Sequence, residues 1–392
     1  MQIKRIYSVD NLFLEHDPEF PHTNIISKEP LILDQGYPQT WPIKQYTDSI
    51  AKCWLSNNIS SNAKKQFLWD FTWTMPGELS HGTDIEPGKL TGTDGQLALL
   101  SKYGPYDVGV CHSFIDETRR NDGRQANIDI IYNWKKITKT IYCLGYVHSA
   151  DSDGIKCIPL NIFPILIREL YPKYKKEDLV PGDFENIYLS YNRKPHRHRI
   201  DLYKTFDAKK LFSKGIFTFN IGQEQDAQLA NRVIEEPLVR NTWIFDDPRS
   251  KLASSDDSSS LGDLNIWNSY FINIVTETEW EDSSIYYEFP FMSEKTFKPI
   301  MGLRPFFIIG HNGIYDWLLN KGFRTFQKYF GFPDNYHLEI TEIAEVVETL
   351  TLRDCELLYK DMLQDINHNY TRFHEFANEI CREQNLLEFI RE

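Results

Sequence analysis

The residues Ser293, Glu294 and Lys295 place a hydroxyl, a carboxylate and an ammonium group next to one another in the sequence. A serine followed by an acidic residue is typical of a helix start, because the serine oxygen can accept a backbone N–H of the first turn. There, a carboxylate can accept hydrogen bonds from both hydroxyls of a ribose, and an ammonium group can bind phosphate. Lys298 follows one turn later and can reach the same side of the helix. The segment therefore predicts a nucleotide site, whereas a capping glutamate and a surface lysine are the structural alternative.

A second charged segment follows a predicted strand over residues 186–191. Between residues 192 and 214 there are eight Lys and Arg residues against two Asp, a net charge of +6 in a chain whose formal net charge is −13. Cations between the end of a strand and the start of a helix favour a diphosphate, because helix N-terminal amides and guanidinium groups both bind phosphate oxygens. The segment therefore predicts a phosphate site, and a solvated basic loop is the alternative.

Both charged segments lie in a chain whose strands and helices are predicted to alternate. In the first part, short apolar runs predict strands, and stretches with helical periodicity lie between them. The predicted strands are 4–9, 30–34, 66–73, 107–114 and 140–147, and the predicted helices are 47–55, 95–103 and 161–170. Strands that alternate with helices indicate a parallel sheet with right-handed crossovers.

The alternation is interrupted by the charged segment 173–183, which contains Pro181-Gly182 and is predicted to be an interdomain linker. It resumes with predicted strands 186–191, 216–220, 242–245, 271–276 and 305–310 and predicted helices 199–206 and 225–235. The Ser-rich segment 254–260 is predicted to be a solvated loop. Apolar residues spaced mostly three and four apart from 352 to 380 predict a long C-terminal helix.

The whole pattern predicts an α/β protein of two domains that face a cleft, with the C-terminal helix bridging back to the first domain. The predicted division is 1–172, 184–350 and a helical tail over 351–392. In open α/β sheets, ligands bind beyond the carboxyl ends of the strands, so the residues just after strands are the candidates for the site.

Several motifs of the second domain occur in an order that resembles a known family. They are Glu277-Thr278 after a strand, Ser293-Glu294-Lys295, the turn Gly302-Leu-Arg-Pro-Phe306 and Gly322-Phe-Arg-Thr-Phe326, with an Asn-Arg-Lys segment upstream at Asn192. Over about residues 186–330, this arrangement is similar to the nucleotide-sugar lobe of fucosyltransferase-like glycosyltransferases of the B type (GT-B), which are built from two Rossmann-like domains.

The resemblance implies transfer of a sugar from a UDP- or GDP-linked donor to an acceptor hydroxyl, without a cofactor or an essential divalent metal. It also implies that Glu294 binds the ribose and Lys295 the diphosphate. The arginine of the upstream segment corresponds to Arg193 or Arg199, between which the spacing does not choose. The residues predicted to bind the nucleotide-sugar are Asn192, Arg193, Arg199, Glu277, Ser293, Glu294, Lys295 and Lys298. The N-terminal domain lies outside the resemblance.

An inverting transfer also needs a base that deprotonates the acceptor hydroxyl. We expect this base at a strand end of the first domain, where the candidates are Asp34, Asp70 and His112, with Glu78 and Asp116 as further choices in the loops that follow. A retaining transfer needs no such base, and the sequence leaves the stereochemistry open.

Two other functions are compatible with the sequence. Asp151 and Asp153 follow a predicted strand, and an Asp-x-Asp of this kind can hold Mn²⁺ or Mg²⁺ against a diphosphate, as in metal-dependent A-type glycosyltransferases. The same two residues also suit a turn. The second alternative is a degenerate site that binds a nucleotide or a carbohydrate without turnover.

Composition bears on the acceptor and on the compartment. The chain has 43 Lys and Arg against 56 Asp and Glu, which argues against a general polyanion-binding protein. The resemblance implies a glycan or a lipid-linked sugar as the first expectation for the acceptor, because most relatives use one. A hydroxymethylated base in phage DNA is the second, and the net charge of −13 counts against it because phosphate contacts normally dominate DNA affinity. The six cysteines form no Cys-x-x-Cys pair, charges interrupt the N-terminal segment, and no apolar run reaches the roughly 18 residues of a membrane span. We expect a cytoplasmic protein.

Overall fold

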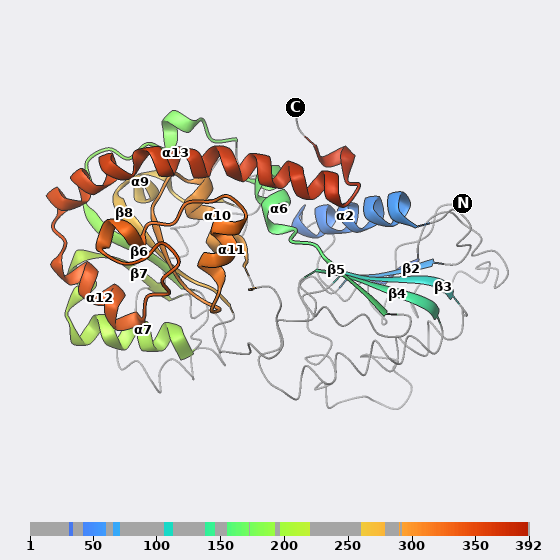
Figure 1. Ribbon diagram of the computed structural model, residues 1–392, viewed down its shortest axis with the longest axis horizontal. Helices are drawn as coiled ribbons and strands as arrows, with labels where there is room; N and C mark the ends of the chain where they lie inside the picture. The colour runs from blue at the N-terminus through green and yellow to red at the C-terminus, as the bar shows by residue number, and fades with distance from the viewer. Residues whose placement is uncertain are drawn as a thin grey trace. The chain divides into compact units, whose positions relative to one another are not determined.

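The computed structural model divides into two units, each built on a parallel β-sheet with helices (Figure 1). It describes residues 31–33, 42–59, 66–70, 106–112, 138–145, 155–171, 173–192, 197–219, 260–278, 290 and 292–390. The first unit comprises Met1–Ile162, Tyr286–Glu288 and Asn378–Glu392, and the second comprises Phe163–Ile285 and Phe289–Ala377. The parallel α/β class is as the sequence predicts, while the division falls after Ile162 rather than after residue 172.

The first unit contains a five-stranded sheet in which the strands are adjacent in chain order and all parallel. These strands are β1 (Leu31–Leu33), β2 (Gln66–Asp70), β3 (Tyr106–His112), β4 (Thr138–Gly145) and β5 (Ile155–Pro159). The first four coincide with predicted strands. The fifth lies outside them, because its five residues include a lysine and end in proline, which gives too short an apolar run to stand out. The predicted strand 4–9 and helix 95–103 lie outside the described residues.

Helix α2 (Pro42–Asn58) packs on this sheet through an apolar face that includes the buried residues Ile50 and Trp54. The Trp54 ring lies 5.3 Å from that of Tyr142 on β4. The end of the chain is part of the same unit, since the Trp54 indole donates to the Gln384 side chain at 3.3 Å and the Asn58 amide donates to the Gln384 carbonyl at 2.9 Å.

The second unit contains a four-stranded parallel sheet whose order is β7-β6-β8-β9. The strands are β6 (Asn186–Asn192), β7 (Gly215–Phe219), β8 (Tyr270–Thr276) and β9 (Phe306–Ile309). Every residue of β8 and β9 is buried, which accounts for their nearly continuous apolar sequences. The chain leaves β6 in one direction to form β7 and returns on the other side to form β8, so the strand order reverses between β6 and β8.

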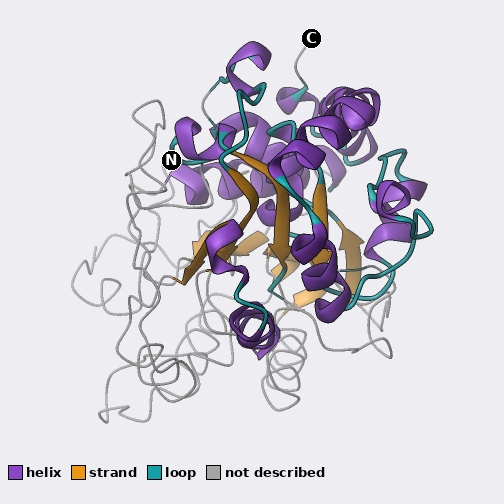
Figure 2. Ribbon diagram, turned by 90° about the vertical axis from the view of Figure 1, so that its left-hand side faces the viewer, coloured by secondary structure: helices purple, strands orange, loops and turns teal. Residues whose placement is uncertain are grey.

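Helices flank this sheet, as Figure 2 shows. Right-handed crossovers in opposite directions place α7 (Arg197–Ala208) and α10 (Glu294–Met301) on opposite faces. In agreement, α7 packs against α12 (Ile340–Thr349) and α10 against α6 (Phe163–Leu170). The other described helices are α9 (Leu264–Asn268), α11 (Ile314–Asn320) and α13 (Leu352–Glu383), with 3-10 turns η1 (Lys176–Leu179), η2 (Leu211–Lys214), η4 (Gln327–Phe330) and η5 (Leu387–Phe389).

The segment 173–183, which the sequence predicts to be a linker, is packed into the second unit. Leu179 is fully buried, and its carbonyl accepts a hydrogen bond of 2.9 Å from the Arg304 guanidinium. Charged residues and the Pro-Gly pair dominate this segment, so its sequence gives no sign that its one leucine is buried. The predicted strand 242–245 and helix 225–235 lie outside the described residues, as does all of 254–260 except Ser260.

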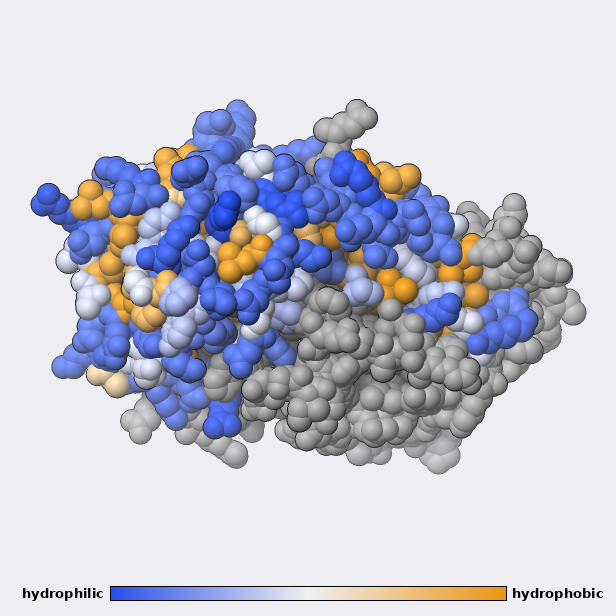
Figure 3. All heavy atoms as spheres, in the orientation of Figure 1, coloured by the Kyte–Doolittle hydropathy of each residue, from blue (hydrophilic) through white to orange (hydrophobic). Residues whose placement is uncertain are grey.

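On the face shown in Figure 3, the described surface is mainly hydrophilic and carries hydrophobic residues in separate groups. None of the described helices combines the length and the hydrophobicity that crossing a bilayer would require.

Candidate functional site

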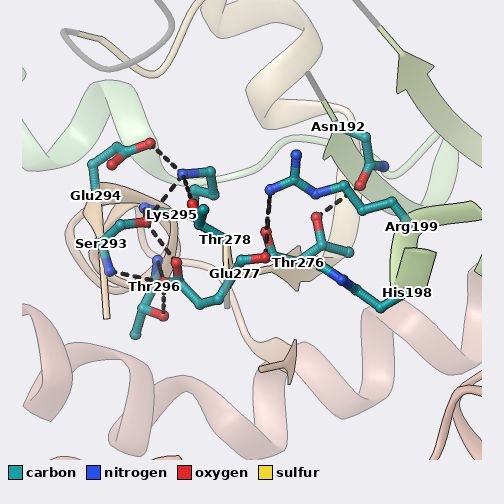
Figure 4. A network of polar contacts seen from close by, with 10 residues as sticks. All are labelled: Asn192, His198, Arg199, Thr276, Glu277, Thr278, Ser293, Glu294, Lys295 and Thr296. Atoms are coloured by element: carbon teal, nitrogen blue, oxygen red, sulfur yellow. Dashed lines mark hydrogen bonds and ion pairs between the residues drawn. The ribbon is translucent and has the colours of Figure 1, made fainter. Parts of the chain in front are cut away.

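The candidate site lies in the second unit, at the carboxyl ends of β6 and β8. Asn192 is the last residue of β6 and Thr276 the last of β8, and the two strands are neighbours. A reversal of strand order leaves a crevice at the carboxyl end of a parallel sheet, because the connections on either side of it run to opposite faces. Helices α7 and α10 both begin close to this reversal, and Figure 4 shows the polar residues that they bring together.

Asn192 joins the two strand ends. Its amide oxygen accepts a hydrogen bond of 2.7 Å from the Thr276 hydroxyl, and its amide nitrogen donates to the Ser190 hydroxyl at 3.0 Å. All three side chains are buried. The Asn192 amide therefore holds the ends of β6 and β8 together.

Helix α7 contributes Arg199 and His198. The Arg199 guanidinium donates to the carbonyl oxygens of Thr276 at 3.1 Å and Glu277 at 3.4 Å. His198 Nε2 lies 2.8 Å from the same Glu277 carbonyl, which can only accept, so this nitrogen carries the proton. Burial and the neighbouring charge of Arg199 lower the pKa of His198 to about 3. The imidazole is thus neutral, and both side chains fasten α7 to the end of β8.

His198 is absent from the residues predicted to form the site. Its surroundings, Asn192-Arg-Lys-Pro-His-Arg-His-Arg199, indicate only positive charge, and nothing in that run distinguishes a buried neutral histidine from an exposed one. Of the two arginines left open by the spacing, Arg199 lies at the crevice, and Arg193 is outside the described residues.

Helix α10 begins as its sequence predicts. The Ser293 hydroxyl caps the helix by accepting the backbone N–H of Lys295 at 3.3 Å. The Lys295 ammonium forms an ion pair of 2.8 Å with Glu294 and also donates to the hydroxyls of Ser293 at 3.1 Å and Thr278 at 3.5 Å. The Glu294 side chain is 9% exposed and that of Lys295 23%, so solvent reaches the ammonium more readily than its partner carboxylate.

The charges of this pair stabilise each other against burial. Burial alone would raise the pKa of Glu294, but the ammonium groups of Lys295 and Lys298 lower it below its ordinary value. Burial alone would lower the pKa of Lys295, but the carboxylates of Glu294 and Glu277 raise it. Both groups are therefore ionised at neutral pH. Lys298 is buried, and its ammonium lies 6.0 Å from the centre of the Tyr171 ring.

Glu277 directly follows β8 and is fully buried. Its carboxylate accepts hydrogen bonds from the backbone N–H of Ser293 at 3.0 Å and of Thr296 at 3.2 Å, and from both of their hydroxyls at 2.6 Å. The sequence predicts that Glu277 binds the nucleotide-sugar; in the structure its carboxylate oxygens accept hydrogen bonds from Ser293 and Thr296.

The candidate bases belong to the first unit. Asp70 and His112 are the last residues of β2 and β3, and their Cα atoms are paired across these adjacent strands. Asp34, Glu78, Asp116, Asp151 and Asp153 lie outside the described residues. Within the part of the chain that the structure describes, no three His, Cys, Asp or Glu side chains converge as a metal site would require.

The described residues thus combine two fixed cations, Arg199 and Lys295, with a buried ionised carboxylate, Glu294, at a reversal of strand order. Such a set can bind an anion and a neighbouring pair of hydroxyl groups, which together are the features of a nucleoside diphosphate. No protein-family model matches the chain, and no curated protein matches it at a significant level.

Proposed function

We propose that the chain is a glycosyltransferase that moves a sugar from a UDP- or GDP-linked donor to an acceptor hydroxyl. In this proposal the two units are the two Rossmann-like domains of the GT-B architecture, and the second unit binds the donor. The observation that supports it best is the partly buried Glu294–Lys295 ion pair on the first turn of α10, beside the reversal of strand order.

Binding of the donor would exchange the partners of this pair. The diphosphate takes the Lys295 ammonium, which is the more exposed of the two groups. The Glu294 carboxylate then accepts the two ribose hydroxyls, which replace the hydrogen bond that it loses. Its lowered pKa keeps it ionised, and an ionised carboxylate can only accept. The carboxylate still has the ammonium of Lys298 nearby, and the ribose hydroxyls supply its hydrogen bonds, which matters because an unpaired buried charge is strongly destabilising.

The same cations would act in the reaction. The bond from the sugar to the diphosphate breaks as the acceptor oxygen attacks, and negative charge develops on the leaving nucleoside diphosphate. Lys295 and Arg199 stabilise that charge without reorganising, because hydrogen bonds hold both side chains in place before the reaction. In an inverting transfer the acceptor proton passes to a base, for which Asp34, Asp70 and His112 are the candidates. A glycan is the first choice of acceptor, and a hydroxymethylated base in DNA the second.

Calorimetric titration with UDP, GDP and their sugar conjugates tests the donor site. We expect the wild-type protein to bind one of the two nucleotides, and Lys295→Met and Glu294→Gln each to weaken that binding by about tenfold or more, since a charge-assisted hydrogen bond contributes about 1.5–3 kcal/mol. Lys328→Met is the matched control, because it breaks an ion pair of the same 2.8 Å length with Asp365 elsewhere in the second unit. Equal affinity in all four proteins would overturn the assignment of the site.

A further inference from the structure

Glu277 makes contacts to both helices that border the crevice. Its carbonyl oxygen accepts hydrogen bonds from His198 and Arg199 of α7, and its carboxylate accepts four hydrogen bonds from the start of α10. Its own N–H donates to the Ile309 carbonyl at 2.9 Å, which extends the pairing of β8 with β9. One residue therefore fixes both α7, which carries Arg199, and α10, which carries Lys295, to the end of β8.

The carboxylate occupies the N-terminus of α10. A helix has four N-terminal N–H groups without partners inside the helix. Here the N–H groups of Ser293 and Thr296 donate to Glu277, and that of Lys295 donates to the Ser293 hydroxyl. Three of these four donors thus have acceptors within the protein. An incoming phosphate cannot use these three N–H groups unless it displaces the groups that already accept from them, so we expect the side chains of Lys295 and Arg199 to provide most of its contacts.

The Ser293 hydroxyl connects Glu277 to Lys295. It donates its proton to the Glu277 carboxylate at 2.6 Å and accepts from the Lys295 ammonium at 3.1 Å. Because the hydroxyl has one proton and two lone pairs, the carboxylate at one end determines how the oxygen faces the ammonium at the other. The negative charge of Glu277 also helps to keep Lys295 protonated.

We propose that Glu277 is a positioning residue of the donor site and does not itself contact the nucleotide. It fixes the first turn of α10, and with it the Glu294–Lys295 pair that receives the ribose and the diphosphate. The inference rests on the proposed function of this site. It also assigns to Glu277 a role different from the direct contact that the sequence motif predicts.

Three roles of Glu277 give different results in anion binding. If the carboxylate acts only through its charge, removing that charge tightens the binding of a phosphate ligand, because a nearby negative charge repels it. If Glu277 contacts the ribose, its removal weakens nucleotide binding and leaves pyrophosphate binding no weaker. If it positions Lys295, loss of its hydrogen bonds weakens pyrophosphate and nucleotide alike, even though a repelling charge has gone.

Two variants separate these roles. Glu277→Gln removes the charge but can keep the three hydrogen bonds to Oε1, whereas Glu277→Ala removes the charge and all the hydrogen bonds of the side chain. Glu339→Ala is the matched control, because Glu339 precedes α12 of the same unit and forms a capping box with Glu342 away from the crevice.

Calorimetric titration with inorganic pyrophosphate, UDP and GDP gives the first readout. We expect Glu277→Ala to bind pyrophosphate and the preferred nucleotide about tenfold more weakly than the wild type, and Glu277→Gln and the control to remain within about threefold of it. Pyrophosphate binding by Glu277→Ala that equals or exceeds that of the wild type would overturn the positioning role.

Hydrogen exchange of the ligand-free proteins gives a second readout that needs no nucleotide. We expect amides 293–296 to exchange faster in Glu277→Ala than in the wild type and to stay protected in Glu277→Gln, while the first turn of α12 changes only in the control. Unchanged exchange in Glu277→Ala overturns the inference whatever the protein binds. If the wild type binds none of the three ligands but Glu277→Ala shows the expected faster exchange, the donor site is overturned. The conclusion that Glu277 fixes α10 then still stands.

Discussion

The Thr276 hydroxyl donates a hydrogen bond of 2.7 Å to the Asn192 amide oxygen, so that the last residues of β8 and β6 are joined where the strand order reverses. Both residues are buried. The two strand ends that form the crevice are therefore held together by side chains as well as by the sheet.

We expect Thr276→Val, which keeps the shape of the side chain, to lower the free energy of unfolding by about 1–3 kcal/mol, because the Asn192 oxygen is left buried without this donor. Urea denaturation measures the change. Thr349→Val is the control, since the exposed Thr349 hydroxyl donates to the Val346 carbonyl at the end of α12. Equal losses in the two variants would contradict a special role for the buried bond.

Arg304 stabilises the opposite end of the same sheet. Its fully buried guanidinium donates to the carbonyls of Trp267 and Leu179, each at 2.9 Å, and to the Asn268 side chain at 2.7 Å. We expect Arg304→Met to cost about 3–5 kcal/mol of unfolding free energy, because several buried acceptors lose their donor together. Chemical denaturation of the isolated variant tests this, with Arg353→Met at an exposed position of α13 as the control. A loss below about 1 kcal/mol would show that other groups replace the guanidinium.

The buried His198 makes stability depend on pH. Its pKa is about 3 in the folded protein, against an ordinary value of 6.5, so between these values the unfolded chain binds more protons than the folded one. The stability contributed by the neutral imidazole is therefore complete above about pH 6.5 and falls as the pH drops toward 3. Between pH 7.5 and pH 5, we expect the wild type to lose roughly 2 kcal/mol more than His198→Gln, whose amide can still donate to the Glu277 carbonyl. Urea denaturation at the two pH values measures the difference, and His368→Gln, at an exposed histidine that also contacts a carbonyl, is the comparison. Parallel losses in the wild type and His198→Gln would contradict the buried neutral state.

The candidate bases can be distinguished by separating binding from turnover. If the transfer inverts, one of Asp34→Asn, Asp70→Asn and His112→Gln should reduce kcat by at least about a hundredfold while donor binding stays unchanged, because a general base acts on the acceptor alone. Steady-state kinetics together with calorimetry measure both quantities. Full activity in all three variants would direct attention to Glu78 and Asp116, or to a retaining reaction.

Treatment with EDTA separates the proposed mechanism from the metal-dependent alternative. We expect turnover of the donor to survive chelation, because Lys295 and Arg199 supply the positive charge that a divalent cation would otherwise provide. Activity that is lost in EDTA and restored by Mn²⁺ would instead favour a site at Asp151 and Asp153.

Local sequence patterns were sufficient to predict the strands and the helix start that surround the candidate site. The buried strands β6, β8 and β9 follow from short apolar runs, and the start of α10 follows from Ser293, because a cap and its acceptor lie within one turn of each other. The adjacency of Glu294 and Lys295 likewise depends only on neighbouring residues.

The tertiary structure decided the partners that are distant in the chain. Nothing local to Glu277 shows that its carboxylate caps α10 rather than facing a ligand, or that its carbonyl receives His198 from 79 residues away. The sequence also predicts segment 173–183 to be a linker, because the partner of its buried Leu179 carbonyl is Arg304, which is distant in the chain. Periodicity and caps depend on interactions within one helix or strand. The order of the strands and the partner of a buried polar group depend instead on how helices and strands pack against one another. The sequence by itself determined the α/β elements and the candidate residues for a nucleotide site, and only the packing decided which of their side chains bind other parts of the protein and which stay partly exposed.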